Sequence, residues 1–165
     1  MKKILVAVDF SRNTIEVVTH AFELAQGLDG KLWIIHVTAD EKLDFIAEDA
    51  SQLLDFDPEF ISAPVDTVEM ARDLCAEEYH REHQAMLKLS AKMNHYGIEA
   101  TSMLLKGETA EIILKKAEDL EIDLIVMGAF GNRLGHEALI GTVTEEVLSK
   151  TKCGVLIIPP PQQDS

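Results

Sequence analysis

The chain of 165 residues is 47% hydrophobic and 27% charged, proportions typical of one folded domain with a substantial core. Its formal net charge of −14 argues against binding of nucleic acid or of an anionic membrane through a basic surface. Any anion site must therefore be built locally, from main-chain dipoles and a few basic side chains.

Cysteine usage and the N-terminal residues both indicate a cytoplasmic protein. Cys75 and Cys153 are far apart and form neither a CxxC motif nor a Cys/His metal spacing, so we expect buried, reduced thiols. The apolar run that opens the chain is too short for a signal peptide. No apolar span reaches the roughly 18 residues that a transmembrane helix needs.

The first predicted unit is a strand, a helix and a second strand. Residues 4–8 form an uninterrupted apolar run, as in a parallel strand covered on both faces, and Asp9 follows its carboxyl end. Asn13 and Glu16 resemble a capping box that begins a helix. The apolar positions of this helix are Ile15, Val18, Phe22 and Ala25. Residues 31–38 are predicted to form the second strand, with a right-handed crossover.

The middle of the chain combines a poorly patterned segment with a long helix. Residues 39–65 are acidic, and we interpret them as a variable connection that shields the site, contacts a partner or is a solvated loop. Asp66 is predicted to cap a helix that continues to about Asn94. Its charged middle, EEYHREH, is expected to face solvent. His80 and His83 could share a ligand, but no third ligand lies within sequence reach, which favours a solvated face.

The remaining residues alternate between strands and helices. Strands are predicted at 99–105, 123–127 and 154–158, one helix is capped by Thr109, and another begins at Gly141-Thr142. The buried positions of these two helices are expected to be Ile112, Ile113 and Ala117, then Val143, Val147 and Leu148. The alternation predicts a single domain over residues 1–165, a three-layer Rossmann-like α/β fold with a parallel sheet, followed by a tail at 160–165. The last strand ends in prolines, as an edge strand would, and we expect a homodimer to cover that edge.

The stretch IVMGAFGNRLGHEALIGTVT, residues 125–144, carries the strongest functional signal. Gly128 and Gly131 follow the fourth strand, and Gly141-Thr142 opens the next helix. Glycines allow a close approach to the main chain, and a helix start presents unpaired N–H groups to an anion. The pattern therefore favours a phosphate site. The alternative is that the glycines serve only to turn the chain.

Further candidate residues lie at the carboxyl ends of the other strands, where ligands bind in open α/β sheets. Asp9 follows the first strand and Val37-Thr38 ends the second. If the first and fourth strands are neighbours, Asp9 faces the glycine loop and could accept hydrogen bonds from a ribose or hold a divalent metal. Turn formation at the strand end is the equally weighted alternative. The chain has no GxxxxGK(S/T) and no GxGxxG, so the usual nucleotide fingerprints do not apply.

The spacing Gly128-x2-Gly131-x9-Gly141-Thr142 resembles the G-x2-G-x9-G-(S/T) signature of the universal stress protein (UspA-like) family, in its ATP-binding branch. KILVAVDFS, IIHV, IDLIVMGAFG and CGVLIIP also look like that family, so the resemblance covers nearly the whole chain. It implies a five-stranded parallel sheet of order 3-2-1-4-5. It also implies a homodimer joined through the last strands, and bound ATP or a related adenine nucleotide such as AMP or ADP.

The resemblance also assigns roles by position. The main chain of Val37 would contact the adenine, and Asp9 and Gly128 would lie by the ribose, with Mg²⁺ or Mn²⁺ as a further ligand that Asp9 could share with the phosphates. The residues implied for the phosphates are Gly131, Asn132, Arg133, Gly141, Thr142, Val143 and Thr144. His136 and Glu137 lie in the same loop, where the charge of Glu137 could reduce phosphate affinity.

Three functional interpretations follow. The first is an ATP-binding regulatory protein of the stress response, which acts through nucleotide-dependent conformation or partner binding. The second is a slow ATPase or autophosphorylating enzyme, although the sequence shows no dedicated base for the attacking water. The third is a nucleotide-free dimeric scaffold. A phosphoacceptor receiver domain would need an aspartate after the third strand, where this chain has Lys106-Gly107, so we set it aside.

Overall fold

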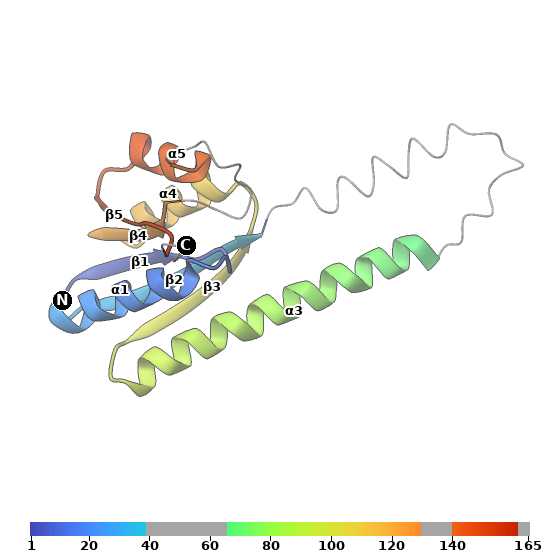
Figure 1. Cartoon of the computed structure of the whole chain (residues 1–165), viewed down its shortest axis with the longest axis horizontal. Helices are drawn as coiled ribbons and strands as arrows, with labels where there is room; N and C mark the ends of the chain where they lie inside the picture. Colours follow the sequence, from blue (N-terminus) through green and yellow to red (C-terminus); the bar gives the residue numbers. More distant parts are fainter. Residues whose placement is uncertain (39–65, 130–139, 162–165) are drawn as a thin grey trace, which may run out of the picture.

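The computed structural model describes residues 1–38, 66–129 and 140–161, with residues 66–75 described by their backbone alone. They form a five-stranded sheet in the order β3-β2-β1-β4-β5 (Figure 1), with every neighbouring pair parallel. The strands are β1 (Lys3–Ala7), β2 (Lys31–Thr38), β3 (Ala100–Lys106), β4 (Leu124–Gly128) and β5 (Gly154–Ile158). The predicted α/β class and strand order are confirmed, and each strand starts within one residue of its predicted position.

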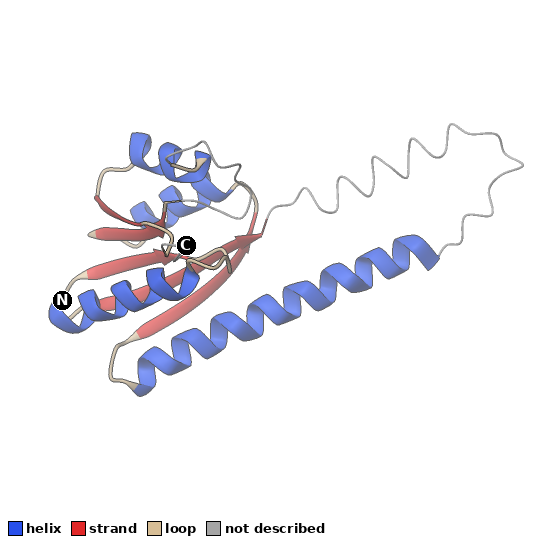
Figure 2. Ribbon diagram, in the orientation of Figure 1, coloured by secondary structure: helices blue, strands red, loops and turns tan. Residues whose placement is uncertain are grey.

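Helices cover both faces of this sheet, as Figure 2 shows. They are α1 (Thr14–Gly27), α3 (Asp66–His95), α4 (Thr109–Asp119) and α5 (Thr142–Lys150). α1 and α3 pack on one face, and α4 and α5 on the other. The predicted long helix is confirmed as α3, and its N-terminal part extends past the carboxyl ends of β2 and β3 (Figure 1).

Alternation along the central strands separates the core into two clusters. Ile4 and Val6 of β1 lie in the cluster with α1 and α3, whereas Leu5 lies in the cluster with α4 and α5. All three side chains are at most 1% exposed. Each such aliphatic side chain contributes roughly 1.5–3 kcal/mol when it is fully buried. The continuous apolar runs are therefore explained by helices on both faces of the sheet.

Two helix caps differ from the prediction. Asn13 occupies the N-cap of α1 but makes no side-chain cap hydrogen bond, because its Nδ2 donates to the carbonyl oxygen of Ile158 instead, at 2.9 Å. Thr109 is not the N-cap of α4. That position belongs to Glu108, whose carboxylate accepts from the Glu111 N–H at 3.0 Å. A carboxylate is favourable there because the helix start is the positive end of the dipole.

Two apolar positions expected to be buried lie at the surface. Ile15 of α1 is 75% exposed and Leu148 of α5 is 40% exposed. Ile15 sits in the first turn of α1, outside the arc occupied by Val18 and Ala25, which are buried. Because an α-helix has about 3.6 residues per turn, only some of the apolar side chains along a helix can face the sheet.

The described part of the chain contains no helix that is long and apolar enough to cross a membrane. Cys153, before β5, is a free thiol and is partly buried. Cys75 lies in α3 among the residues described by backbone alone, so its expected burial lies outside the described side chains.

Candidate functional site

The carboxyl ends of β1 and β4 are neighbours at the point where the strand order reverses. Ala7 of β1 pairs with Met127 of β4, so the predicted adjacency of these strands is confirmed. Asp9 follows the end of β1, and Gly128 is the last residue of β4. The fold therefore brings these residues to one edge of the sheet, at the position where open α/β sheets bind ligands.

The start of α5 lies at the same edge and carries main-chain donors that have no acceptor among the described residues. Its N-cap, Gly141, has extended backbone angles and no side-chain cap. The Gly141 N–H donates to the Ala129 carbonyl at 2.8 Å, so this amide is used within the protein. The next three N–H groups, of Thr142, Val143 and Thr144, have no acceptor among the described residues. Such a helix start favours an anion through its N–H groups and its dipole.

The two threonines of this turn differ in their surroundings. Thr144 is 3% exposed, and its hydroxyl donates to the Gly128 carbonyl at 3.0 Å. Thr142 is exposed. The Thr144 side chain therefore ties the start of α5 to the end of β4, while the hydroxyl of Thr142 is accessible to a ligand.

Asp9 forms a turn at the end of β1. Its Oδ1 accepts from the Ser11 N–H at 2.9 Å and lies 3.4 Å from the Thr14 hydroxyl. Turn formation, one of the two roles considered for Asp9, is thus observed. The described residues contain no group of three or more His, Cys, Asp and Glu side chains that could hold a metal ion.

Asn13 links the two loops that border this edge, a role that the sequence did not reveal. It is 5% exposed, and its Nδ2 donates to Ile158 O, which also accepts from the Ala129 N–H at 2.9 Å. Because Ile158 O can only accept, the amide orientation is determined, and Oδ1 is left buried without a partner. One carbonyl thus joins the β1–α1 loop, the end of β4 and the end of β5.

His36 is a second residue that sequence reasoning missed. It is 8% exposed, its Nδ1 lies 2.7 Å from the Val8 carbonyl oxygen, and its Nε2 lies 3.4 Å from Oε1 of Glu82. Glu82 was expected to face solvent, but its side chain is only 20% exposed. The expectation fails at Glu82 because this part of α3 passes over the end of β2, although most of the charged stretch is exposed as expected. Val37 follows His36 and is partly buried.

Several predicted residues cannot be placed. Gly131, Asn132 and Arg133, with His136 and Glu137, lie outside the described residues. The described part of the candidate site therefore consists of Asp9, Val37, Gly128, Gly141, Thr142, Val143 and Thr144.

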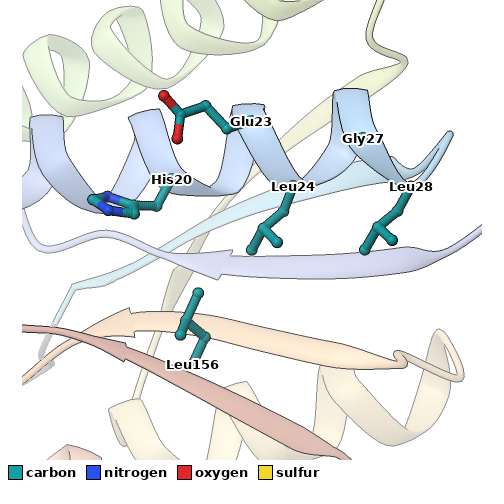
Figure 3. A pocket seen from close by; sticks show the side chains of 6 residues that line it. All are labelled: His20, Glu23, Leu24, Gly27, Leu28 and Leu156. Carbon is teal, nitrogen blue, oxygen red and sulfur yellow. The ribbon is translucent and has the colours of Figure 1, made fainter.

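An apolar pocket of about 350 Å³ lies elsewhere, between α1 and β5 (Figure 3). Leu24 of α1 and Leu28, directly after this helix, point towards the strands, and Leu156 points towards them from β5. The pocket is lined by His20, Glu23, Leu24, Gly27, Leu28 and Leu156. It borders the edge strand and includes none of the candidate site residues.

The family model of the universal stress protein family matches residues 1–159. The chain belongs to the universal stress protein family. Universal stress protein MJ0531 of Methanocaldococcus jannaschii is 29% identical over 164 residues, which cover 99% of this chain and 85% of that protein. The solved structure of MJ0577, from the same organism, superposes with a TM-score of 0.72 at 23% identity and covers 98% of each chain.

Two more distant universal stress protein structures contain adenine nucleotides. One, in complex with cAMP, has a TM-score of 0.60 at 16% identity and covers 97% of this chain and 98% of its own. The other, from Archaeoglobus fulgidus in complex with dAMP, has a TM-score of 0.55 at 20% identity and covers 96% and 98%. At these identities the likeness establishes the fold of this universal stress protein.

Proposed function

We propose that this universal stress protein binds an adenine nucleotide, ATP or its relatives AMP and ADP, at the carboxyl edge of its sheet. In this proposal it is a regulatory protein of the stress response that acts through nucleotide-dependent conformation or partner binding. The main support is the start of α5, where the N–H groups of residues 142–144 have no described acceptor. On a chain of net charge −14, such local dipoles are what an anion would require.

The proposed division of roles follows the edge of the sheet. The amides at the start of α5 and the Thr142 hydroxyl would hold phosphate, Gly128 and Asp9 would lie beside the ribose, and the Val37 main chain would contact the base. Gly131, Asn132 and Arg133 would complete the phosphate site. Mg²⁺ or Mn²⁺, if bound, would neutralise phosphate charge beside Asp9. The cAMP and dAMP complexes of family members support an adenine nucleotide as the ligand class.

The direct test is to extract the purified, undialysed protein and to measure whether ATP, AMP or no nucleotide co-purifies with it. We expect Gly128→Ala and Gly141→Val to abolish binding, measured by calorimetric titration with ATP and with AMP, because each adds side-chain volume beside the ligand. The extended backbone of Gly141, φ −73° and ψ 158°, is open to any residue, so thermal unfolding should remain cooperative. Unchanged affinity in either folded variant would contradict the proposed site.

We further propose a cytoplasmic homodimer joined through β5. β5 is an edge strand of the described sheet, and its residues Val155, Leu156 and Ile157 are only partly buried. Leu156 also lines the apolar pocket between α1 and β5 (Figure 3). An apolar edge with unpaired main-chain groups favours pairing with another strand.

A further inference from the structure

At the end of β2, the side chain of His36 makes a hydrogen bond in the place where a backbone hydrogen bond between β1 and β2 would be expected. The last rung between β1 and β2 is the bond from the Val8 N–H to the Ile35 carbonyl, at 2.9 Å. In a regular parallel ladder the next rung would run from the Val37 N–H to the Val8 carbonyl. That carbonyl accepts from Nδ1 of His36 instead, at 2.7 Å, and no described backbone N–H donates to it. The imidazole thus leaves the Val37 N–H without this partner.

The His36 ring is fixed from several sides. Since Val8 O can only accept, Nδ1 must carry a proton. Nε2 lies 3.4 Å from a carboxylate oxygen of Glu82 on α3, a contact that is attractive when Nε2 also carries a proton. The ring of Phe10 meets the imidazole edge to face, with centroids 4.7 Å apart. These three contacts all favour the orientation in which Nδ1 donates to the Val8 carbonyl.

Phe10 adopts a backbone conformation that is unusual for its residue type. Its φ of 55° lies in the left-handed region, which bulky L-residues rarely adopt. Phe10 directly follows Asp9 and is 36% exposed. A conformation of this kind persists only where the surroundings impose it, and such residues concentrate at functional sites. The strained turn places the aromatic ring against His36.

We propose that His36 is a positioning residue of the nucleotide site. By donating a hydrogen bond to the Val8 carbonyl, it keeps the main-chain N–H and C=O of Val37 available to the base. Glu82 holds the ring in that position. The inference rests on the proposed adenine-nucleotide function. Adenine presents a ring-nitrogen acceptor beside its amino donor, which complements the N–H and C=O of one residue. His36 itself does not contact the ligand.

The first test needs no ligand. We expect His36→Leu to let the Val37 N–H close onto the Val8 carbonyl, which slows hydrogen exchange of the Val37 amide by at least about tenfold in NMR spectra. His36→Asn should keep the wild-type rate, because its Nδ2 can occupy the place of Nδ1. Glu82→Ala should slow exchange by a smaller factor, and Glu77→Ala, which changes an exposed carboxylate on the same helix, should not. An unchanged Val37 rate in His36→Leu would overturn the inference.

The second test uses AMP as the probe. We expect the dissociation constant of AMP to rise at least about tenfold in His36→Leu and to stay within about threefold of wild type in His36→Asn. Equal affinity of wild type and His36→Leu, with Val37 exchange slowed, would overturn the role of His36 in binding. Failure of the wild-type protein to bind AMP, ADP and ATP would contradict the proposed function, while the exchange measurement would still decide whether His36 positions Val37.

Discussion

Thr144 and Thr142 begin the same helix but face different surroundings. Thr144 is 3% exposed and its hydroxyl donates to the carbonyl of Gly128, while Thr142 is exposed. A buried hydroxyl is retained in a core when it satisfies a carbonyl that water cannot reach. At this position the hydroxyl also ties the start of α5 to the end of β4.

Thr144→Val should lower the free energy of unfolding by about 1–2 kcal/mol, because it removes a buried hydrogen bond with almost no change in volume. Thr142→Val is the matched control and should change stability by less than about 0.5 kcal/mol. Urea denaturation of both variants measures the difference. Equal stability of the two variants would show that the Thr144 hydroxyl does not stabilise the loop.

At the scale of elements, the two sides of β5 differ in a way that can be tested. The carbonyl of Ile158 accepts from Ala129 on the β4 side, so Gly154, Leu156 and Ile158 direct their main-chain groups towards β4. Val155 and Ile157 alternate with these residues, so their main-chain N–H and C=O groups point towards the open edge of the sheet. Proline is tolerated in a strand where its missing N–H would have pointed outward.

We expect Ile157→Pro to sediment as a monomer while thermal unfolding remains cooperative, because it removes an outward donor and leaves the β4–β5 ladder intact. Ile157→Ala shortens the same side chain but keeps its N–H, and should remain dimeric. Sedimentation velocity distinguishes the two variants. A wild-type monomer, or a dimer of Ile157→Pro, would contradict the proposed pairing through β5.

How far the sequence predicts this fold varies between elements. Apolar runs predicted the strands because both faces of each central strand are covered, and burial of this kind leaves a local signal. Caps were less predictable. Thr109 was chosen by residue type, but Glu108 precedes it and its carboxylate reaches the Glu111 N–H. Asn13 is at the N-cap of α1, but its side chain donates to the carbonyl of Ile158, 145 residues away, and does not cap the helix.

The candidate site shows the same limit. Gly128, Gly141 and Thr142 form a local pattern of loop and helix start, so spacing alone could indicate them. His36 and Glu82 gave no such signal, because their contact depends on where α3 crosses the end of β2. Nor could sequence show that the Gly141 N–H donates to the Ala129 carbonyl, so that the amides without an acceptor in the described part of the chain are those of residues 142–144. Long-range partners of this kind follow only from the assembled fold.

The pH dependence of the stability of the protein is expected to involve Asp123, which connects β1 with the start of β4 at the amino edge of the sheet. The Lys3 backbone N–H donates to its Oδ2 at 2.8 Å, and that bond, with Lys2 nearby, holds the pKa of the carboxyl below its ordinary value of 3.8. A carboxyl with a lowered pKa stabilises the folded state when it is ionised. Its contribution is complete above the ordinary pKa and is lost as the pH falls through the lowered one.

We therefore expect the free energy of unfolding of Asp123→Asn to fall less steeply than that of wild type below about pH 4. Asp119→Asn, which alters an exposed carboxylate on α4, should follow the wild-type curve. Urea unfolding between about pH 6 and about pH 3 gives the slopes. Parallel acid limbs for wild type and Asp123→Asn would contradict this assignment.

β2 continues past the last backbone hydrogen bond that it shares with β1. At Val37 the strand therefore presents main-chain N–H and C=O groups, and not a side chain, to a ligand in the proposed site. Every amino acid except proline supplies the same donor and acceptor at that point. Replacement of the valine during evolution would change the bulk beside a bound molecule and leave those two polar groups in place. In the proposed binding mode, recognition by the Val37 main chain therefore does not depend on the side chain at residue 37, whereas it does depend on His36.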